Sequence, residues 1–224
     1  MGIRIGLVIA TVAVTAGYVC EEPRRELFEA IDAANVDLKG FSERFYRDVC
    51  GGELAPVLET LVYLHRETDV WLEVTTLLIP GENDSEQELH AMSAWVVENL
   101  GPDVPWHFTA FHPDYRMNDR PRTPAASLTL ACEIARGHGV RHVYTGNVHD
   151  PAGQSTYCHA CGEIAIERDG YTIGRFRLDE IGRCAACGTT CPGVFEPKPG
   201  GWGSRRLPVQ LAGFRSPAQG AVQS

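Results

Sequence analysis

The sequence predicts an α/β fold, in which a parallel sheet of the partial (β/α)-barrel kind is followed by a small metal-binding module. Between residues 5 and 148, apolar runs alternate with amphipathic stretches, a pattern typical of βα units around a parallel sheet. After residue 155 the pattern changes to four cysteines in two Cys-x2-Cys pairs. A chain of 224 residues with 44% hydrophobic and 22% charged residues can bury a sizeable core. We therefore expect one large domain and one small one.

Five apolar runs have the length and composition of buried strands. They are residues 7–14, 34–38, 71–79, 106–111 and 142–145. The first run follows a single early arginine and superficially resembles a secretory signal peptide. It is too short to span a bilayer and is followed directly by a helix signal, so we interpret it as a strand.

Amphipathic segments separate the predicted strands. Pro23 stands at the start of the first segment, and residues 53–65 carry a broad apolar face. Residues 84–88 predict a helix start, because an oxygen-bearing cap and early acidic side chains complement the unpaired amides and the positive end of the helix dipole. Thr123 and Pro124 open a further helix, which is expected to end at Gly137 or Gly139.

The two cysteine pairs predict a structural zinc site. The expected ligands are Cys158, Cys161, Cys184 and Cys187. Each pair is followed by a glycine that lets the chain fold back under the two sulfurs, and two such pairs complete a tetrahedral shell of four thiolates. The 22 residues between the pairs alternate well enough for a hairpin of residues 163–168 and 171–178, turned at Asp169-Gly170.

Alternatives to zinc are two disulfides or a thioredoxin-like redox motif, but the pairs do not open a helix after a strand. His159, inside the first pair, is interpreted as an exposed bystander. Cys191 is either a fifth thiol that competes for the metal or a cysteine that does not bind it.

The net charge and the cysteine pattern indicate which kind of partner and which cellular compartment to expect. The net charge is −9, and no dense basic cluster occurs outside the short Arg205-Arg206 pair. We therefore expect no nucleic-acid partner and no membrane, but a small molecule or a protein. Cysteines gathered in metal-type pairs fit a reducing compartment, which predicts a cytoplasmic protein.

Polar side chains follow several predicted strands, where parallel βα folds gather their reactive groups. Asp37, Lys39 and His112 are the candidates on this ground. Asp37 and Lys39 point to the same side of a strand, so the alternative is a structural role in which they pair with neighbours at the rim. Residues 80–84 are interpreted as a turn and helix cap. His107, within a strand, is interpreted as a hydrogen-bonded core or rim histidine.

Four segments together resemble a known enzyme family. They read VDLKGF at 36–41, WLEVTTLLIPGEND at 71–84, PWHFTAFHPDY at 105–115 and VYTGNV at 143–148. In this order, and with the cysteine module behind them, they are similar to the radical SAM enzymes of the AmmeMemoRadiSam system. These enzymes are related to the activating enzymes of glycyl-radical enzymes such as pyruvate formate-lyase. The resemblance covers residues 7–195.

The resemblance implies a partial TIM-type barrel with a [4Fe-4S] cluster, held by Cys-x3-Cys-x2-Cys, that reductively cleaves S-adenosylmethionine (SAM). The resulting 5′-deoxyadenosyl radical abstracts hydrogen from a substrate, a polypeptide glycine in the activating enzymes. By position, Lys39 meets the methionine carboxylate, and Asp37 with Thr15 shapes the polar or cation site beside it. Thr75 and Leu77 border the cofactor, and His112 lies against the adenine.

The sequence also departs from this family. It contains no Cys-x3-Cys-x2-Cys motif, and its pattern begins at what would be the family's third strand. Residues 15–17 read Thr-Ala-Gly, where relatives have Thr-Asn-Gly. We therefore expect a barrel lacking its first strands, from an N-terminally truncated enzyme that is inactive alone.

The expected division is a partial barrel at residues 1–150, a zinc-ribbon-like module at 151–195 and a flexible Pro/Gly-rich tail at 196–224. Two other functions stay open. One is a non-catalytic, zinc-stabilised interaction module. The other is a Schiff-base lyase with Lys39 as the nucleophilic amine.

Overall fold

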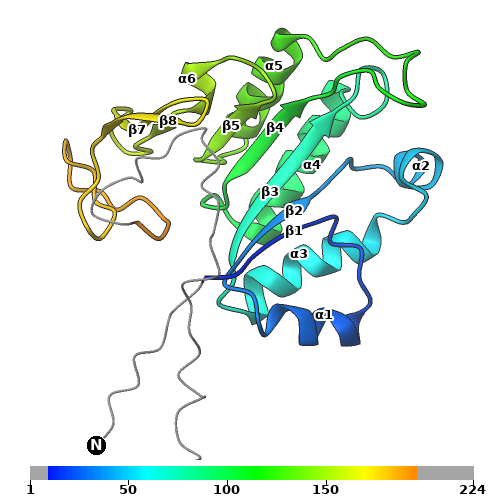
Figure 1. Ribbon diagram of the computed structural model, residues 1–224, viewed down its shortest axis with the longest axis horizontal. Helices are drawn as coiled ribbons and strands as arrows, with labels where there is room; N and C mark the ends of the chain where they lie inside the picture. Colours follow the sequence, from blue (N-terminus) through cyan, green and yellow to red (C-terminus); the bar gives the residue numbers. More distant parts are fainter. Residues whose placement is uncertain (1–9, 196–224) are drawn as a thin grey trace, which may run out of the picture.

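A computed structural model describes residues 10–195 and shows a parallel sheet beside a smaller antiparallel one (Figure 1). The parallel sheet contains β1 (Val12–Thr15), β2 (Ala33–Asp37), β3 (Trp71–Leu78), β4 (Trp106–Ala110) and β5 (Val143–Gly146). Its strands pair in chain order, β1-β2-β3-β4-β5, and every pairing is parallel. All five predicted strands are present. The start of the first prediction, residues 7–9, and the predicted tail at 196–224 lie outside the described residues.

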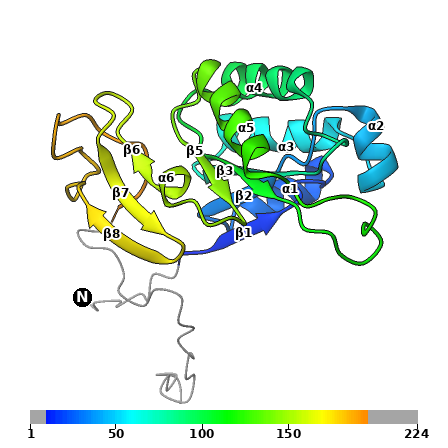
Figure 2. The same ribbon diagram turned by 90° about the horizontal axis from the view of Figure 1, so that it is seen from above.

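Among the described residues, the four longer helices all lie on one face of this sheet (Figure 2). They are α1 (Glu21–Phe28), α3 (Ala55–Glu67), α4 (Glu86–Leu100) and α5 (Ala125–Gly137). Each matches a predicted helix. Short elements that the sequence analysis missed are α2 (Glu43–Phe45), the π-helix η1 (Tyr46–Cys50) and α6 (Pro151–Gln154).

The strands therefore have one apolar and one polar side. Successive strand residues point to opposite faces, and the side chains toward the helices form the core. Val36, Val74 and Phe108 are fully buried there. The opposite face carries half-exposed polar side chains: Asn35, Asp37, Glu73, Thr75, His107, Thr109 and Tyr144. We call this set the open polar face.

The loop after β3 fixes the ends of β2 and β3 through one buried side chain. Asn83 is 0% exposed, and its Oδ1 accepts a hydrogen bond from the backbone N–H of Ile79 at 2.7 Å. Its Nδ2 donates to the carbonyl of Lys39 at 2.5 Å and to that of Leu77 at 2.9 Å. Ser85 then caps α4 by accepting from the N–H of Glu88. The turn predicted within residues 80–84 is confirmed, and the cap of α4 is Ser85, one residue further on.

The small sheet contains β6 (Thr156–Tyr157), β7 (Ile164–Asp169) and β8 (Thr172–Phe176) in antiparallel order. The predicted hairpin is present between β7 and β8, and Gly170 turns it with a φ of +57° that favours glycine. The small sheet has an apolar cluster of its own, formed by Ala165, Ile166, Leu178 and Cys191. In the part of the chain that is described, no helix has the length and apolar character needed to cross a membrane.

Removing the side-chain amide of Asn83 should destabilise the fold more than its size suggests. We expect Asn83→Ala to lower the free energy of unfolding by about 2–3 kcal/mol, because three backbone groups at the ends of β2 and β3 lose their partner. Urea denaturation measures this. Asn99→Ala, which removes a single bond to the Trp95 carbonyl, is the control and should cost less than about 1 kcal/mol. Equal costs for the two variants would contradict this role of Asn83.

Candidate functional site

The carboxyl end of the open polar face holds a close ion pair. Nζ of Lys39 lies 2.7 Å from Oδ2 of Asp37, and the two side chains keep 38% and 33% of their surface exposed. Both leave β2 and its extension on the same side, as the alternation of the strand requires. The pairing anticipated from the sequence is confirmed. Because the pair is partly exposed, an anionic ligand can reach the ammonium group.

The backbone around Lys39 is held rigidly, although it lies outside a regular strand. Its N–H donates to the hydroxyl of Tyr46 at 3.1 Å, and the N–H of Phe41 donates to a carboxylate oxygen of Glu88 at 2.6 Å. Burial raises the pKa of Tyr46 well above its ordinary value, so this hydroxyl stays neutral. Together with Asn83, these contacts fix the direction in which Lys39 leaves the sheet.

Three further predicted site residues lie on neighbouring strands or their ends. Thr75 is in register with Asp37, and its hydroxyl donates to Oδ1 of Asn35 at 2.8 Å. Leu77 is 36% exposed one alternation further along β3. His112 is exposed in the segment after β4 and has no hydrogen bond to the described residues. Thr75 and Leu77 thus lie on the strand next to β2 on the face that carries Lys39, and His112 follows the carboxyl end of β4.

Thr15 lies differently from its predicted position beside Asp37. It is in register with Val36, whose side chain is buried under the helices. Asp37, the next residue, points to the opposite face. The hydroxyl of Thr15 accepts a hydrogen bond from the N–H of Gly17 at 3.1 Å. The structure thus gives Thr15 a role in the turn after β1.

The four predicted metal ligands converge. The Sγ atoms of Cys158, Cys161, Cys184 and Cys187 all lie within 4.8 Å of one another. The Cys158–Cys187 and Cys161–Cys184 Sγ distances are 3.6 and 3.8 Å. Zinc–sulfur bonds of about 2.3 Å place tetrahedral thiolates about 3.8 Å apart, so the set fits one zinc ion. Hydrogen bonds to Thr189 lower the pKa of Cys187 to about 6, which favours a thiolate.

Two neighbouring residues are not part of this ligand group. Cys191 is buried in the apolar cluster of the small sheet, and burial raises the pKa of its thiol to about 11. His159 was predicted to be exposed, but it is half-buried with its ring edge-on to that of His142 at 5.9 Å. All eight cysteines are free, so the disulfide alternative is not seen.

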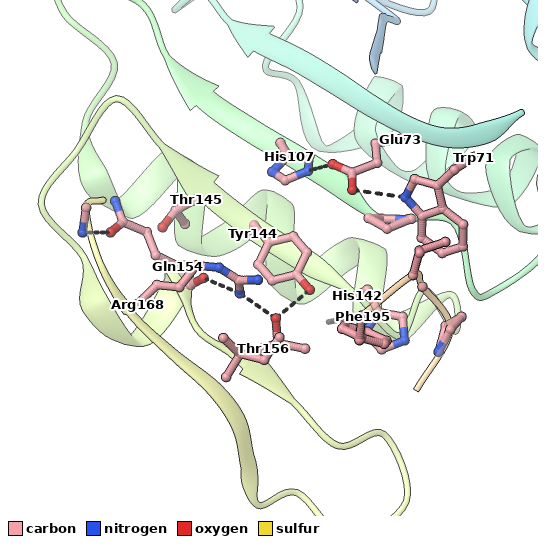
Figure 3. Close-up of a pocket in the computed structure, with 16 residues that line it drawn as sticks. Trp71, Glu73, His107, His142, Tyr144, Thr145, Gln154, Thr156, Arg168 and Phe195 are labelled. Atoms are coloured by element: carbon pink, nitrogen blue, oxygen red, sulfur yellow. Dashed lines mark hydrogen bonds and ion pairs between the residues drawn. The ribbon is translucent and has the colours of Figure 1, made fainter. Parts of the chain in front are cut away.

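Sequence reasoning missed a second polar group nearer the start of the strands (Figure 3). Nε2 of His107 lies 2.8 Å from Oε2 of Glu73, and Nε1 of Trp71 donates to the other oxygen of Glu73 at 3.2 Å. Burial raises the pKa of Glu73, but the bonds from His107 and Trp71 outweigh it, and the net shift is downward. His107 is therefore hydrogen-bonded, as interpreted, and its carboxylate partner stays charged.

The chain resembles known proteins in sequence and in fold. No family profile matches it. It is 41% identical over 178 residues to an uncharacterized protein of Methanocaldococcus jannaschii, across 79% of this chain and 52% of that protein. The chain thus spans about half the length of this relative.

Two solved structures are similar to the chain. A domain of a pyruvate-formate lyase-activating enzyme from Bacteroides vulgatus has a TM-score of 0.52 at 14% identity, covering 60% of this chain and 80% of that domain. A radical SAM methyltransferase from Sphaerobacter thermophilus has a TM-score of 0.44 at 15% identity, covering 59% and 39%. The first of these likenesses shows a shared fold.

Loss of one thiolate should abolish metal retention. We expect the purified chain to carry one zinc ion, and Cys187→Ser to lose it, because a structural site needs all four ligands. Elemental analysis with hydrogen exchange checks this, with exchange rising in β6, β7 and β8 and unchanged in β2 and β3. Cys20→Ser, at an exposed isolated cysteine, is the matched control. A full zinc content in Cys187→Ser would refute the assignment.

Proposed function

We propose that this chain carries the SAM-binding part of a radical SAM enzyme of the AmmeMemoRadiSam kind, related to glycyl-radical-enzyme activating enzymes. The fold likeness to an activating-enzyme domain supports the scaffold. The Asp37–Lys39 pair at the carboxyl end of the parallel sheet is the observation that carries the proposal. Ligands of parallel α/β sheets bind at this end of the strands.

The side chains at the carboxyl end of the sheet complement the chemical groups of SAM. The ammonium of Lys39 complements the methionine carboxylate, and Asp37 complements the amino group or a cation beside it. Thr75 and Leu77 offer one hydroxyl and one apolar surface along the ligand. His112 supplies a flat ring that can stack on or hydrogen-bond to the adenine. Because the backbone of Lys39 is fixed, little ordering is needed when the ligand binds.

The reductive cleavage of SAM depends on an iron–sulfur cluster, and the cysteines of this chain do not fit one. The Cys-x3-Cys-x2-Cys motif does not occur in the 224 residues. The four cysteines that converge enclose room for a single ion. We therefore infer that radical formation requires a cluster supplied by another segment or polypeptide, and that the substrate, a polypeptide glycine in the activating enzymes, is met by the complete assembly.

Measuring SAM binding tests the role proposed for the Asp37–Lys39 pair. We expect isothermal titration to detect SAM binding to the zinc-loaded chain. Lys39→Gln should weaken it at least about tenfold, since one charge-assisted contact to a carboxylate is lost. Arg66→Gln, at an exposed position on α3, removes the same charge elsewhere and should leave the affinity unchanged. No binding at all, or equal affinity of the two variants, would count against the proposal.

A second experiment tests the dependence on an external cluster. After anaerobic incubation with iron and sulfide, the chain alone should neither gain [4Fe-4S] absorbance nor release 5′-deoxyadenosine from SAM under reducing conditions. The reason is that its cysteines lack the three-ligand spacing of the family. An isolated chain that performs this cleavage would overturn the inference while leaving the SAM site intact.

A non-catalytic interaction module is a second candidate function. The convergent cysteines and the uncovered sheet face favour it. It predicts bound zinc without SAM affinity, so the same titration separates the two. For a Schiff-base lyase, Lys39 would have to act as a free amine, whereas its ion pair with Asp37 stabilises an ammonium.

A further inference from the structure

A cavity of about 510 Å³ lies between the open polar face and the small antiparallel sheet (Figure 3). Its walls come from the early halves of β3, β4 and β5, from α6 and β7, and from residues 192–195. It is thus distinct from the Lys39 rim at the other end of the strands. Nothing in the proposed function requires it.

One end of the cavity is apolar and the other is charged. Trp71, Pro105 and Phe195 form flat apolar walls. At the charged end, Arg168 reaches in from β7, with its guanidinium 5.9 Å from the ring centre of Tyr144. Nη1 of Arg168 donates to Thr156 at 2.5 Å, whereas Nε and Nη2 have no hydrogen-bond partner among the described residues.

His107 is positioned to face the same space. Its Nε2 is hydrogen-bonded to Glu73, and its ring stacks on that of Tyr144 with the ring centroids 5.0 Å apart. Nδ1 has no hydrogen-bond partner among the described residues. A carboxylate hydrogen-bonded to one ring nitrogen fixes the orientation of the ring.

Two side chains of opposite charge, Glu73 and Arg168, line the cavity. The titratable and charged groups that line it are Glu73, His107, Arg168, His142 and Tyr144. Burial lowers the pKa of His142 and raises that of Tyr144, so both are neutral near pH 7. Both oxygens of Glu73 are engaged by His107 and Trp71, whereas Nε and Nη2 of Arg168 can donate to an anionic ligand.

We propose that this cavity binds a monocarboxylate with a flat apolar body, its carboxylate at Arg168 and its body against Trp71 and Phe195. Arginine donors in a partly desolvated site suit a carboxylate. Glu73 is held by His107 and Trp71 and does not contact the ligand's charge.

Phenylacetate, with its neutral isostere phenylacetamide, is the probe that tests this site. We expect calorimetric titration of the full zinc-loaded chain to show saturable binding of phenylacetate, at least about tenfold tighter than phenylacetamide. No saturable binding of phenylacetate, or equal affinity of the two probes, would overturn the proposal.

Variants locate the binding. Arg168→Gln should weaken phenylacetate at least about tenfold, whereas Arg175→Gln, on the exposed β8 and paired with Glu167, should not. Thr156→Val breaks the bond to Arg168 but keeps its charge, so it should retain most of the affinity. Equal losses in Thr156→Val and Arg168→Gln would assign the effect to the packing of the small sheet and contradict the anion site. If Arg168→Gln loses its zinc, the comparison of the two probes decides.

Discussion

The structure depends on a single constraint: in the described part of the chain, the long helices cover only one face of the parallel sheet. In a parallel sheet with both faces covered, each strand reads as a continuous apolar run. Here β2, β3 and β4 alternate instead, so that Val36, Val74 and Phe108 are buried while the residues beside them keep polar side chains half-exposed. The open polar face follows directly from this asymmetry, and both ligand sites proposed for the chain lie along it.

Two groups of charged side chains lie at opposite ends of that face. At the carboxyl end, Asp37 and Lys39 neutralise each other, and a buried network through Asn83 and Tyr46 fixes the backbone beneath them. Nearer the start of the strands, Glu73 instead orients His107 toward the cavity beneath the small sheet. A zinc ion held by the four cysteines would stabilise the small sheet, from which Arg168 enters the cavity.

Local patterns in the sequence were enough to predict the five strands, the four long helices and the four converging cysteines. Each of these rests on residues close together in the chain, or on spacing with a fixed geometric meaning. The face taken by Thr15 could not be predicted, because it depends on register with Val36 in another strand. The Glu73–His107 pair joins residues 34 positions apart and requires β3 and β4 to be neighbours. The cavity depends on how two sheets pack, which no local pattern encodes.

The most direct test of the account is to map where SAM contacts the isotopically labelled chain by NMR. The account predicts that backbone signals of Lys39, Thr75, Leu77 and His112 shift on addition of SAM, while signals of α3 and α4 on the covered side do not. Shifts confined to the helices, or to the four-cysteine module, would contradict the claim that the uncovered face of the sheet is the functional surface.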